Sequence, residues 1–302
     1  MFISKIMDYQ NLSDEQFKRR FGVYKQTYRK MVESVKSVEA DSNSPSKRGP
    51  KPKLSIEEQV LVTLEYWREY RTYFHIGTSW ELSESTIGRI VNKTEKMLLQ
   101  SGNFRLKGKK ALLNQAEIPV ITVMDVTETP IERPQKKQKD FLGGKRGYHT
   151  LKSQLVADQN TEEIICVFCG KGRGHDFSLF KKSRVRFHPL TTSIEDSGYQ
   201  GIDAYHSNSY TPKKKSKNRK LTELEKEYNK ALAKERIIIE PINRKLKIFK
   251  ILSCKYRNRR RRYSLRVNLL AAIYNCELGI GIAAEVLNVE KSQKKNAIID
   301  RI

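Results

Sequence analysis

The sequence predicts an all-helical region over about the first hundred residues, followed by a domain that mixes strands and helices, of the α+β or α/β class. Apolar residues recur at helical spacing over residues 12–38 and 55–100. After residue 115, short runs of β-branched residues alternate with helical segments. With 302 residues, of which 38% are hydrophobic, the chain is long enough to bury a sizeable core.

Residues 1–38 are expected to form a first helical unit. Ser13 is a suitable N-cap because two acidic residues, Asp14 and Glu15, follow it in the first helical turn. Residues 39–53 then become polar and rich in proline, so they cannot bury much apolar surface. We interpret this segment as a basic linker that lies along nucleic-acid phosphates.

Residues 54–112 carry the pattern of a helix-turn-helix, which begins with a capping box formed by Ser55 and Glu58. A helix at residues 73–80, a short turn and a helix at residues 84–93 follow. The second helix is expected to turn one face to the core, with Ile87, Ile90 and Val91. Its other face is then free to meet base edges and phosphates in a major groove, with Ser85, Thr86, Arg89, Asn92 and Lys93. A plain helical hairpin with a solvated polar face is the alternative.

Residues 117–285 are expected to form the mixed domain, and residues 286–302 a polar tail. Three strand-like runs follow in succession and suggest a meander, at residues 118–126, 151–157 and 164–169. The remaining expected elements are a helix at residues 176–180, a strand at 191–196, and helices at 221–252 and 263–279.

Two aspartates are expected to close strands of this domain. Asp125 ends the first apolar run and Asp196 ends the fourth, which places both carboxylates beside loops, where sites are usually built. Carboxylates are the ligands that hard divalent cations prefer, and two such ions activate water or a DNA 3′-hydroxyl for phosphoryl transfer. From position alone, capping of a turn or helix is an equally good interpretation. Glu128 and Glu132 are weaker ligand candidates for which structural roles are favoured.

The charge of the chain points to a polyanionic partner. Lys and Arg number 59 against 34 Asp and Glu, a formal net charge of +25, and nucleic acid is the first candidate. A membrane surface is disfavoured, because the basic residues are spread along the whole chain and no apolar run approaches the length of a membrane span. We therefore expect a cytoplasmic protein. Two charge runs, residues 213–220 and 257–262, are interpreted as tracks for a DNA backbone.

No motif predicts a nucleotide or zinc site. Cys166 and Cys169 have the spacing of a zinc pair, but they lie in a strand-like apolar run with no second pair, so core positions are favoured. His149 and His175 lack His or Cys neighbours, and His175 is expected to cap the helix that follows it. The glycine-rich residues 143–147 lack the spacing and the ending of a phosphate-binding P-loop.

Four stretches of the second domain carry a resemblance to a known family. They are residues 125–134 (DVTETPIERP), 141–152 (FLGGKRGYHTLK), 174–176 (GHD) and 196–201 (DSGYQG). In order and content they resemble the catalytic half of insertion-sequence transposases of the IS-five group, over residues 120–279. The resemblance implies a ribonuclease H-like fold, an Asp, Asp, Glu triad at Asp125, Asp196 and Glu240, and Mg²⁺ or Mn²⁺, with two ions bound.

The third carboxylate of the implied triad lies in residues 236–247 (RIIIEPINRKLK). Arg236, Glu240 and Lys247 match the spacing of the family's Tyr, Arg, Glu, Lys signature, whereas Ala233 stands where the tyrosine is expected. On a continuous helix Arg236 and Lys247 would share the face of Glu240 and bind DNA phosphates. Pro241 interrupts or begins a helix, so the alternative places Arg236 before it.

The expected function follows from this resemblance. The chain would bind the terminal inverted repeats of its element through the helical region, pair two ends as a homo-oligomer, cleave the strands and transfer them into double-stranded target DNA. The alternative is a DNA-binding regulator that has kept the fold and lost catalysis. A site-specific nuclease on the same scaffold is a nearer alternative, which a strand-transfer assay separates.

Overall fold

The computed structural model describes residues 9–41, 52–114, 119–143, 147–216, 219–258 and 260–280. Most of the expected linker at residues 39–53 and the expected tail at residues 286–302 lie outside these ranges. No helix in the described part of the chain is both long enough and apolar enough to cross a bilayer.

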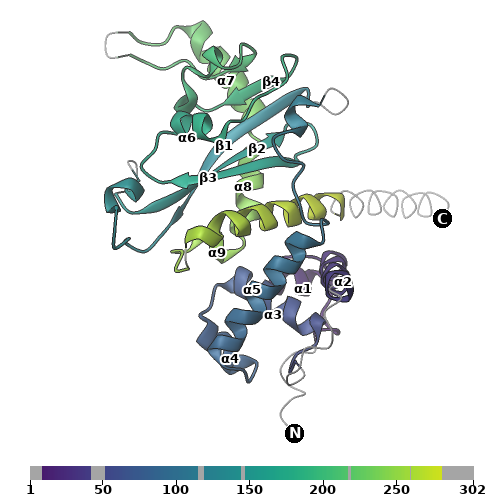
Figure 1. Cartoon of the computed structure of the whole chain (residues 1–302). Helices are drawn as coiled ribbons and strands as arrows, with labels where there is room; N and C mark the ends of the chain where they lie inside the picture. The colour runs from purple at the N-terminus through teal and green to yellow at the C-terminus, as the bar shows by residue number, and fades with distance from the viewer. Residues whose placement is uncertain are drawn as a thin grey trace, which may run out of the picture.

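The second domain is built on one mixed five-stranded sheet (Figure 1). Its strands are β1 (Ile121–Pro130), β2 (Thr150–Asp158), β3 (Ile164–Lys171), β4 (Thr192–Glu195) and β5 (Ser209–Tyr210), in the spatial order β3-β2-β1-β4-β5. The first three strands form the expected antiparallel meander. β4 then joins β1 in parallel, and β5 joins β4 in parallel.

Helices cover both faces of this sheet. On one face α6 (Asp176–Ser183) packs through Phe180 on Met124 of β1 and Val156 of β2. The other face carries α8 (Ile239–Lys247), α9 (Lys250–Ser253) and a C-terminal helix described over residues 263–280, whose Tyr263 hydroxyl bonds to Ser153 and Thr129. α7 (Glu223–Arg236) lies beside β4. With the preceding helical region, this is the ribonuclease H-like α+β fold that the sequence predicts.

The helical region contains α1 (Asp14–Phe21), α2 (Lys25–Asp41), α3 (Ile56–Glu69), α4 (Tyr73–Ser79) and α5 (Glu84–Gln100). Ser13 caps α1 and Ser55 caps α3, each in a complete capping box, as the sequence predicts for Ser55 and Glu58. α3 is central: it packs on α1, α2 and α5 and is buried along most of its length. Short 3₁₀ turns complete the described chain, at Ala111–Leu113, Gln138–Phe141, Ser197–Tyr199, Ile202–Ala204 and Arg260–Arg262.

The C-terminal helix joins the two regions. It lies between the sheet and the helical region (Figure 1), and one continuous apolar core contains residues of all three parts. Within that core the carboxylate of Glu95, on α5, accepts hydrogen bonds from Trp67 and from Arg266 of the C-terminal helix. Glu95 and Arg266 are almost completely buried. The helical region and the sheet are therefore held together by an apolar core with an ion pair inside it.

One expected boundary was wrong. Asp125 does not close its strand, because β1 continues to Pro130. The reason is that the two neighbours of β1 differ in length: β2 pairs with it from Thr122 to Pro130, whereas β4 pairs only as far as Met124. Asp125 therefore lies in mid-strand, at the point where β1 loses its partner on one side.

Candidate active site

Asp125 and Asp196 are brought side by side by the parallel pairing of β1 and β4. Met124 and Glu195 are register partners, so the next residue on each strand is one of the two aspartates. β4 ends at Glu195, and Asp196 becomes the N-cap of the following 3₁₀ turn, where its Oδ1 accepts a 2.7 Å hydrogen bond from the backbone N–H of Gly198. The end of β4 thus opens a crevice with a carboxylate on each side.

The pKa of the Asp125 carboxyl group is raised by its surroundings. Burial raises the pKa of its carboxyl group, nearby Arg236 acts in the lowering direction, and Asp196 raises it further. The Nη2 atom of Arg236 lies 4.0 Å from Oδ1 of Asp125, and the side-chain nitrogen of Asn243 donates a 2.9 Å hydrogen bond to Oδ2. Two neighbouring carboxylates, both half-buried, are an arrangement that a bound cation stabilises.

Lys152 forms a second charged cluster beside the two aspartates. It stands opposite Glu128 in the pairing of β1 with β2, and its ammonium group is 3.7 Å from the Glu128 carboxylate. The same ammonium group donates to the carbonyl of Gly174 at 2.7 Å and to Asp176 Oδ1 at 2.8 Å. Glu128, which the sequence offers as a possible ligand, is therefore engaged with a buried lysine.

Gly198 lies between the Lys152 cluster and Asp196. A Cβ atom added at Gly198 would lie 2.8 Å from an oxygen of Asp176 and 2.8 Å from Oδ1 of Asp196. Such an approach is closer than real Cβ atoms make, so only glycine lets both carboxylates reach this turn.

These side chains line one cavity of about 600 Å³. It contains both aspartates, the Lys152 cluster, and several cationic or amide groups: Lys214, Asn243 and Lys247, with Arg173 and His175 at the start of α6. A pocket of this kind, with carboxylates at its floor and cations around them, suits a phosphodiester.

Glu240 does not line that cavity. It is exposed on α8, one helical turn before Asn243, and lines a separate shallow depression with Arg244 and Lys247. Residues three apart on a helix share a face, so Glu240 lies on the face of α8 that meets Asp125 through Asn243. Of the three carboxylates implied by the resemblance, the structure brings two together and leaves the third on the adjoining turn.

The alternative placement of Arg236 is the one that occurs. α7 ends at Arg236 and α8 begins at Ile239, so the chain is not one continuous helix. Pro241 lies in the first turn of α8, where its missing N–H costs no helical hydrogen bond. Arg236 nevertheless reaches Asp125 from the end of α7.

The donor set at Asp125 and Asp196 fits a divalent metal ion. All candidate ligand atoms are hard oxygens, and the side-chain oxygen of Asn243, next to Asp125, is buried without a hydrogen-bond partner. In the described ranges, no three Asp, Glu, His or Cys side chains are already arranged around a common point as metal ligands. The two aspartates are therefore the two candidate metal ligands that the fold places side by side.

The helix-turn-helix face is arranged much as expected. Ile87 and Val91 are fully buried, and Ile90 is half-buried. The expected DNA-facing residues are exposed except for Thr86, which is half-buried; they are Ser85, Arg89, Asn92 and Lys93. Arg89 bonds to Ser85 in its own helix, whereas the Lys93 ammonium group lies 2.6 Å from the Glu39 carboxylate on α2.

One of the two expected DNA tracks is partly occupied by contacts within the chain. In the run at residues 257–262, Arg257 stacks on Tyr70, Arg260 lies over Phe141, and Arg262 pairs with Glu95. These guanidinium groups pack where the helical region meets the sheet, while Arg257, Arg260 and Arg261 remain exposed, so the interpretation of this run as a phosphate track stays a prediction. In the other run, Lys214 lines the candidate active site.

The remaining expectations concern Cys166, Cys169 and His175. The two cysteines lie on opposite faces of β3, in separate apolar clusters, and both are free thiols. That geometry suits core residues. His175 is the N-cap residue of α6, although its side chain makes no capping hydrogen bond.

Sequence reasoning missed Lys152, Asp176 and Asn243 as site residues. A lysine inside an apolar strand was the available signal for Lys152, since an unpaired lysine is rarely buried. For Asn243 the signal was its helical spacing from Glu240. Asp176 follows His175 in a matched motif, but its contact with Lys152 depends on the pairing of β2 with β3 and is not visible in the sequence.

Comparisons with known proteins agree on one family. The family described as DDE superfamily endonuclease matches residues 124–275, and the one described as helix-turn-helix of DDE superfamily endonuclease matches residues 52–104. A relative from Microchaete diplosiphon, named "Probable transposase for insertion sequence element IS702", is 54% identical over 276 residues, which cover 91% of this chain and 99% of the relative. No solved structure matches the chain.

Proposed function

This chain belongs to the insertion-sequence transposases of the DDE endonuclease superfamily, and from that membership we propose that it performs cut-and-paste transposition of its own element. Residues 54–112 bind the terminal inverted repeats, and residues 117–285 cleave the DNA and transfer its ends. Two ends are paired by a homo-oligomer. The net charge of +25 supports extensive contact with double-stranded DNA.

The catalytic residues of this proposal are Asp125, Asp196 and Glu240, which would hold two Mg²⁺ or Mn²⁺ ions. Such ions would lower the pKa of the attacking hydroxyl group and neutralise charge on the phosphate undergoing displacement. Support for Glu240 is its place on α8 one turn from Asn243, which bonds to Asp125.

The chain's own groups then have distinct tasks. Asn243 and Arg236 fix the orientation of the Asp125 carboxylate through the contacts at 2.9 Å and 4.0 Å. The N–H of Gly198 fixes Asp196. Lys214 and Lys247 line the crevice and are placed to contact phosphates that flank the scissile one.

The single observation that carries the proposal is the adjacency of Asp125 and Asp196 where β4 ends. A structural role for these carboxylates alone would not require two of them beside an open crevice, with the pKa of one raised by burial.

The test is removal of one carboxylate charge at a time. Asp125→Asn and Asp196→Asn are each expected to abolish cleavage of a duplex that carries the element end, while binding of that duplex persists. Asp203→Asn, an exposed aspartate in the 3₁₀ turn that follows, is the matched control and should cleave normally. Cleavage near the wild-type rate in either active-site variant would contradict the assignment. A strand-transfer assay with pre-cut ends separates a transposase from a nuclease.

A further inference from the structure

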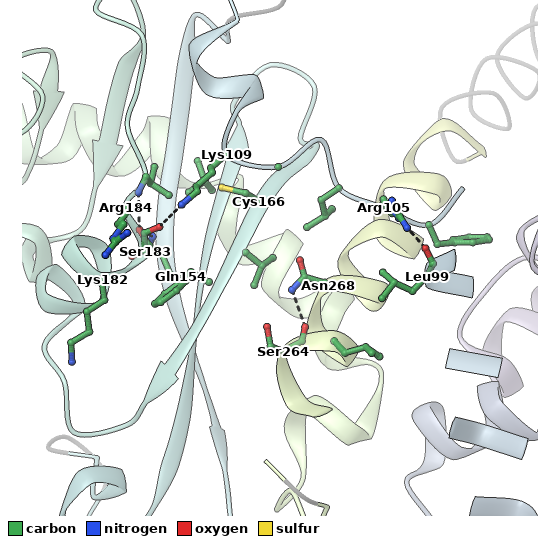
Figure 2. A pocket seen from close by; sticks show the side chains of 18 residues that line it. Leu99, Arg105, Lys109, Gln154, Cys166, Lys182, Ser183, Arg184, Ser264 and Asn268 are labelled. Atoms are coloured by element: carbon green, nitrogen blue, oxygen red, sulfur yellow. Dashed lines mark hydrogen bonds between the residues drawn. The ribbon is translucent and has the colours of Figure 1, made fainter. Parts of the chain in front are cut away.

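A second cavity, of about 550 Å³, lies beside the outer strand β3 (Figure 2), and it shares no lining residue with the cavity of the two aspartates. Its walls are the loop at residues 104–109, the outer strand β3, the C-terminal end of α6 and one side of the C-terminal helix. We call it the basic cleft, after the four cationic side chains that line it: Arg105, Lys109, Lys182 and Arg184.

The charge of the basic cleft has one sign. No Asp or Glu is among the described residues that line it, and none of its four cations forms an ion pair with a carboxylate in the described part of the chain. Lys107, next to the cleft, differs because it pairs with Glu163 at 2.8 Å. Four like charges around one cavity repel one another, so an anion bound there relieves an unfavourable interaction.

The cleft is assembled from segments far apart in the sequence. The Lys109 ammonium group donates to the carbonyl of Ser183 at 3.3 Å, and the N–H of Gly108 donates to the carbonyl of Ile165 on β3 at 2.9 Å. Figure 2 shows Lys109 and Arg184 on either side of Ser183, with Arg105 across the cleft near the end of α5. These contacts hold the loop at residues 104–109 against β3 and the end of α6.

The occupant of the basic cleft is inferred from the distance between the cleft and the candidate active site. α6 begins at Asp176, in the cavity of the two aspartates, and ends at Ser183, in the basic cleft. Its 8 residues span about 12 Å, at about 1.5 Å per residue. Duplex DNA rises about 3.4 Å per base pair, so the length of α6 equals the rise of roughly three to four base pairs.

We propose that the basic cleft holds the phosphodiester backbone of the same duplex whose scissile phosphate enters the candidate active site, about three to four base pairs from that phosphate. The proposal rests on the proposed function, because it takes the cleaved element end as the ligand. A second copy of the chain is a poor occupant, since each copy carries a net charge of +25 and would bring further cations to the cleft.

Protection of the sheet edge is the competing role for these cations. An exposed outer strand is a site of unwanted pairing between chains, and flanking lysines oppose it. That role requires no DNA contact at the cleft, so the salt dependence of DNA binding distinguishes the two.

The experiment uses the full chain and a duplex that extends at least ten base pairs on both sides of the scissile phosphate. The test variant is Lys182→Gln with Arg184→Gln; Lys109 is kept because it holds Ser183. The control variant is Arg20→Gln with Arg29→Gln, two exposed cations on α1 and α2 that lower the charge by the same amount. The logarithm of the DNA-binding constant falls linearly with the logarithm of the salt concentration, and each lost phosphate contact makes this slope shallower by about 0.9. The slope of the test variant should therefore be shallower than that of the control by about 2.

Two truncated duplexes test whether the same DNA occupies both cavities. Each ends within about two base pairs of the scissile phosphate on one side only, and the test and control variants should bind one of them with equal slopes. Equal slopes on the long duplex would overturn the proposal, and so would a difference that persists on both truncated ones. If the wild-type chain does not cleave the element end, the proposed function fails instead, whereas equal slopes with intact cleavage contradict the basic cleft alone.

Discussion

The side-chain nitrogen of Asn243 donates a 2.9 Å hydrogen bond to Oδ2 of Asp125, across 118 residues of sequence. This bond ties α8 to β1 at the point where β1 loses its partner β4. The position of α8, and with it that of Glu240, therefore depends on a contact made by the half-buried Asp125.

Replacing Asn243 by Ala is expected to weaken metal binding and cleavage without unfolding the chain. The variant removes the group that donates to Asp125 and leaves the guanidinium group of Arg236, 4.0 Å from Asp125, in place. Loss of a group that orients a metal ligand costs about 10-fold to 100-fold in metal affinity or activity. Mn²⁺ titration measures the affinity, and Arg244→Ala, an exposed neighbour on α8, is the control. Equal Mn²⁺ affinity in the two variants would show that the hydrogen bond has no such role.

Glu240→Gln is expected to retain DNA binding and lose cleavage. The amide keeps the size of the side chain but removes the negative charge that a metal ligand supplies. Because Glu240 is exposed, the substitution should leave the unfolding free energy within about 0.5 kcal/mol of the wild type. Cleavage and denaturant unfolding measured on one preparation separate the two effects. Normal cleavage by this variant would show that Glu240 is not the third catalytic carboxylate. Asp176, which approaches Gly198 together with Asp196, would then be the next candidate.

Local signals explain why much of the site could be predicted from the sequence. The capping boxes, the buried face of α5 and the strands before the two aspartates each depend on residues within one element, so spacing alone reveals them. The partners of those aspartates depend on contacts between elements. Asn243 meets Asp125, and Lys152 meets Asp176, only after the sheet has formed.

Contacts between elements also explain what the sequence could not show. The apolar run of β1 stops at Asp125, which predicts a strand end there. Pairing with β2 nevertheless continues β1 through polar residues up to Pro130. A charge run carries no information about its partners within the chain. Three arginines of residues 257–262 contact the carboxylate of Glu95 and the rings of Tyr70 and Phe141, all distant in sequence.

Arg89 and Lys93 are expected to differ in their effect on recognition of the repeat. Both are exposed on α5, but Lys93 is held by Glu39 of α2, whereas Arg89 bonds only within its own helix in the described contacts. Arg89→Ala should weaken binding of the cognate repeat by about 1–3 kcal/mol, the value of a base contact. Lys93→Gln should reduce binding equally on cognate and random duplexes. Competition binding with both duplexes measures this, and equal losses for Arg89→Ala would assign it to phosphate contact.

Glu95 is expected to be the most sensitive single position for stability. Its buried carboxylate lies 2.6 Å from Nε of Arg266, which is itself almost completely buried, and burial of the Arg266 guanidinium is offset by this charge. Glu95→Ala leaves that cation without its partner, which costs about 3–5 kcal/mol. Urea unfolding measures the loss. Glu39→Gln, which breaks the exposed pair with Lys93, is the control and should cost under about 1 kcal/mol.

Glu277 is expected to make stability fall as pH rises. It lies on the C-terminal helix, where the backbone N–H of Tyr24 and the hydroxyl of Thr27 donate to it and Lys18 lies 3.6 Å away. Burial nevertheless raises the pKa of its carboxyl group above the usual value, so the folded state binds the proton more tightly than the unfolded state. The free energy of unfolding therefore decreases as pH rises from the unfolded pKa through the raised folded pKa, by at most about 1.4 kcal/mol per pH unit.

Glu277→Gln removes this titration and keeps the shape of the side chain. The difference in unfolding free energy between wild type and variant should shift in favour of the variant across that pH interval, because only the wild type must ionise a buried carboxyl group. Urea unfolding at several pH values from 4 to 7 measures it, with Glu33→Gln, an exposed site on α2, as the control. A difference that stays constant with pH would show that the hydrogen bonds from Tyr24 and Thr27 fully offset burial, and that this end of the C-terminal helix is held equally well at every pH.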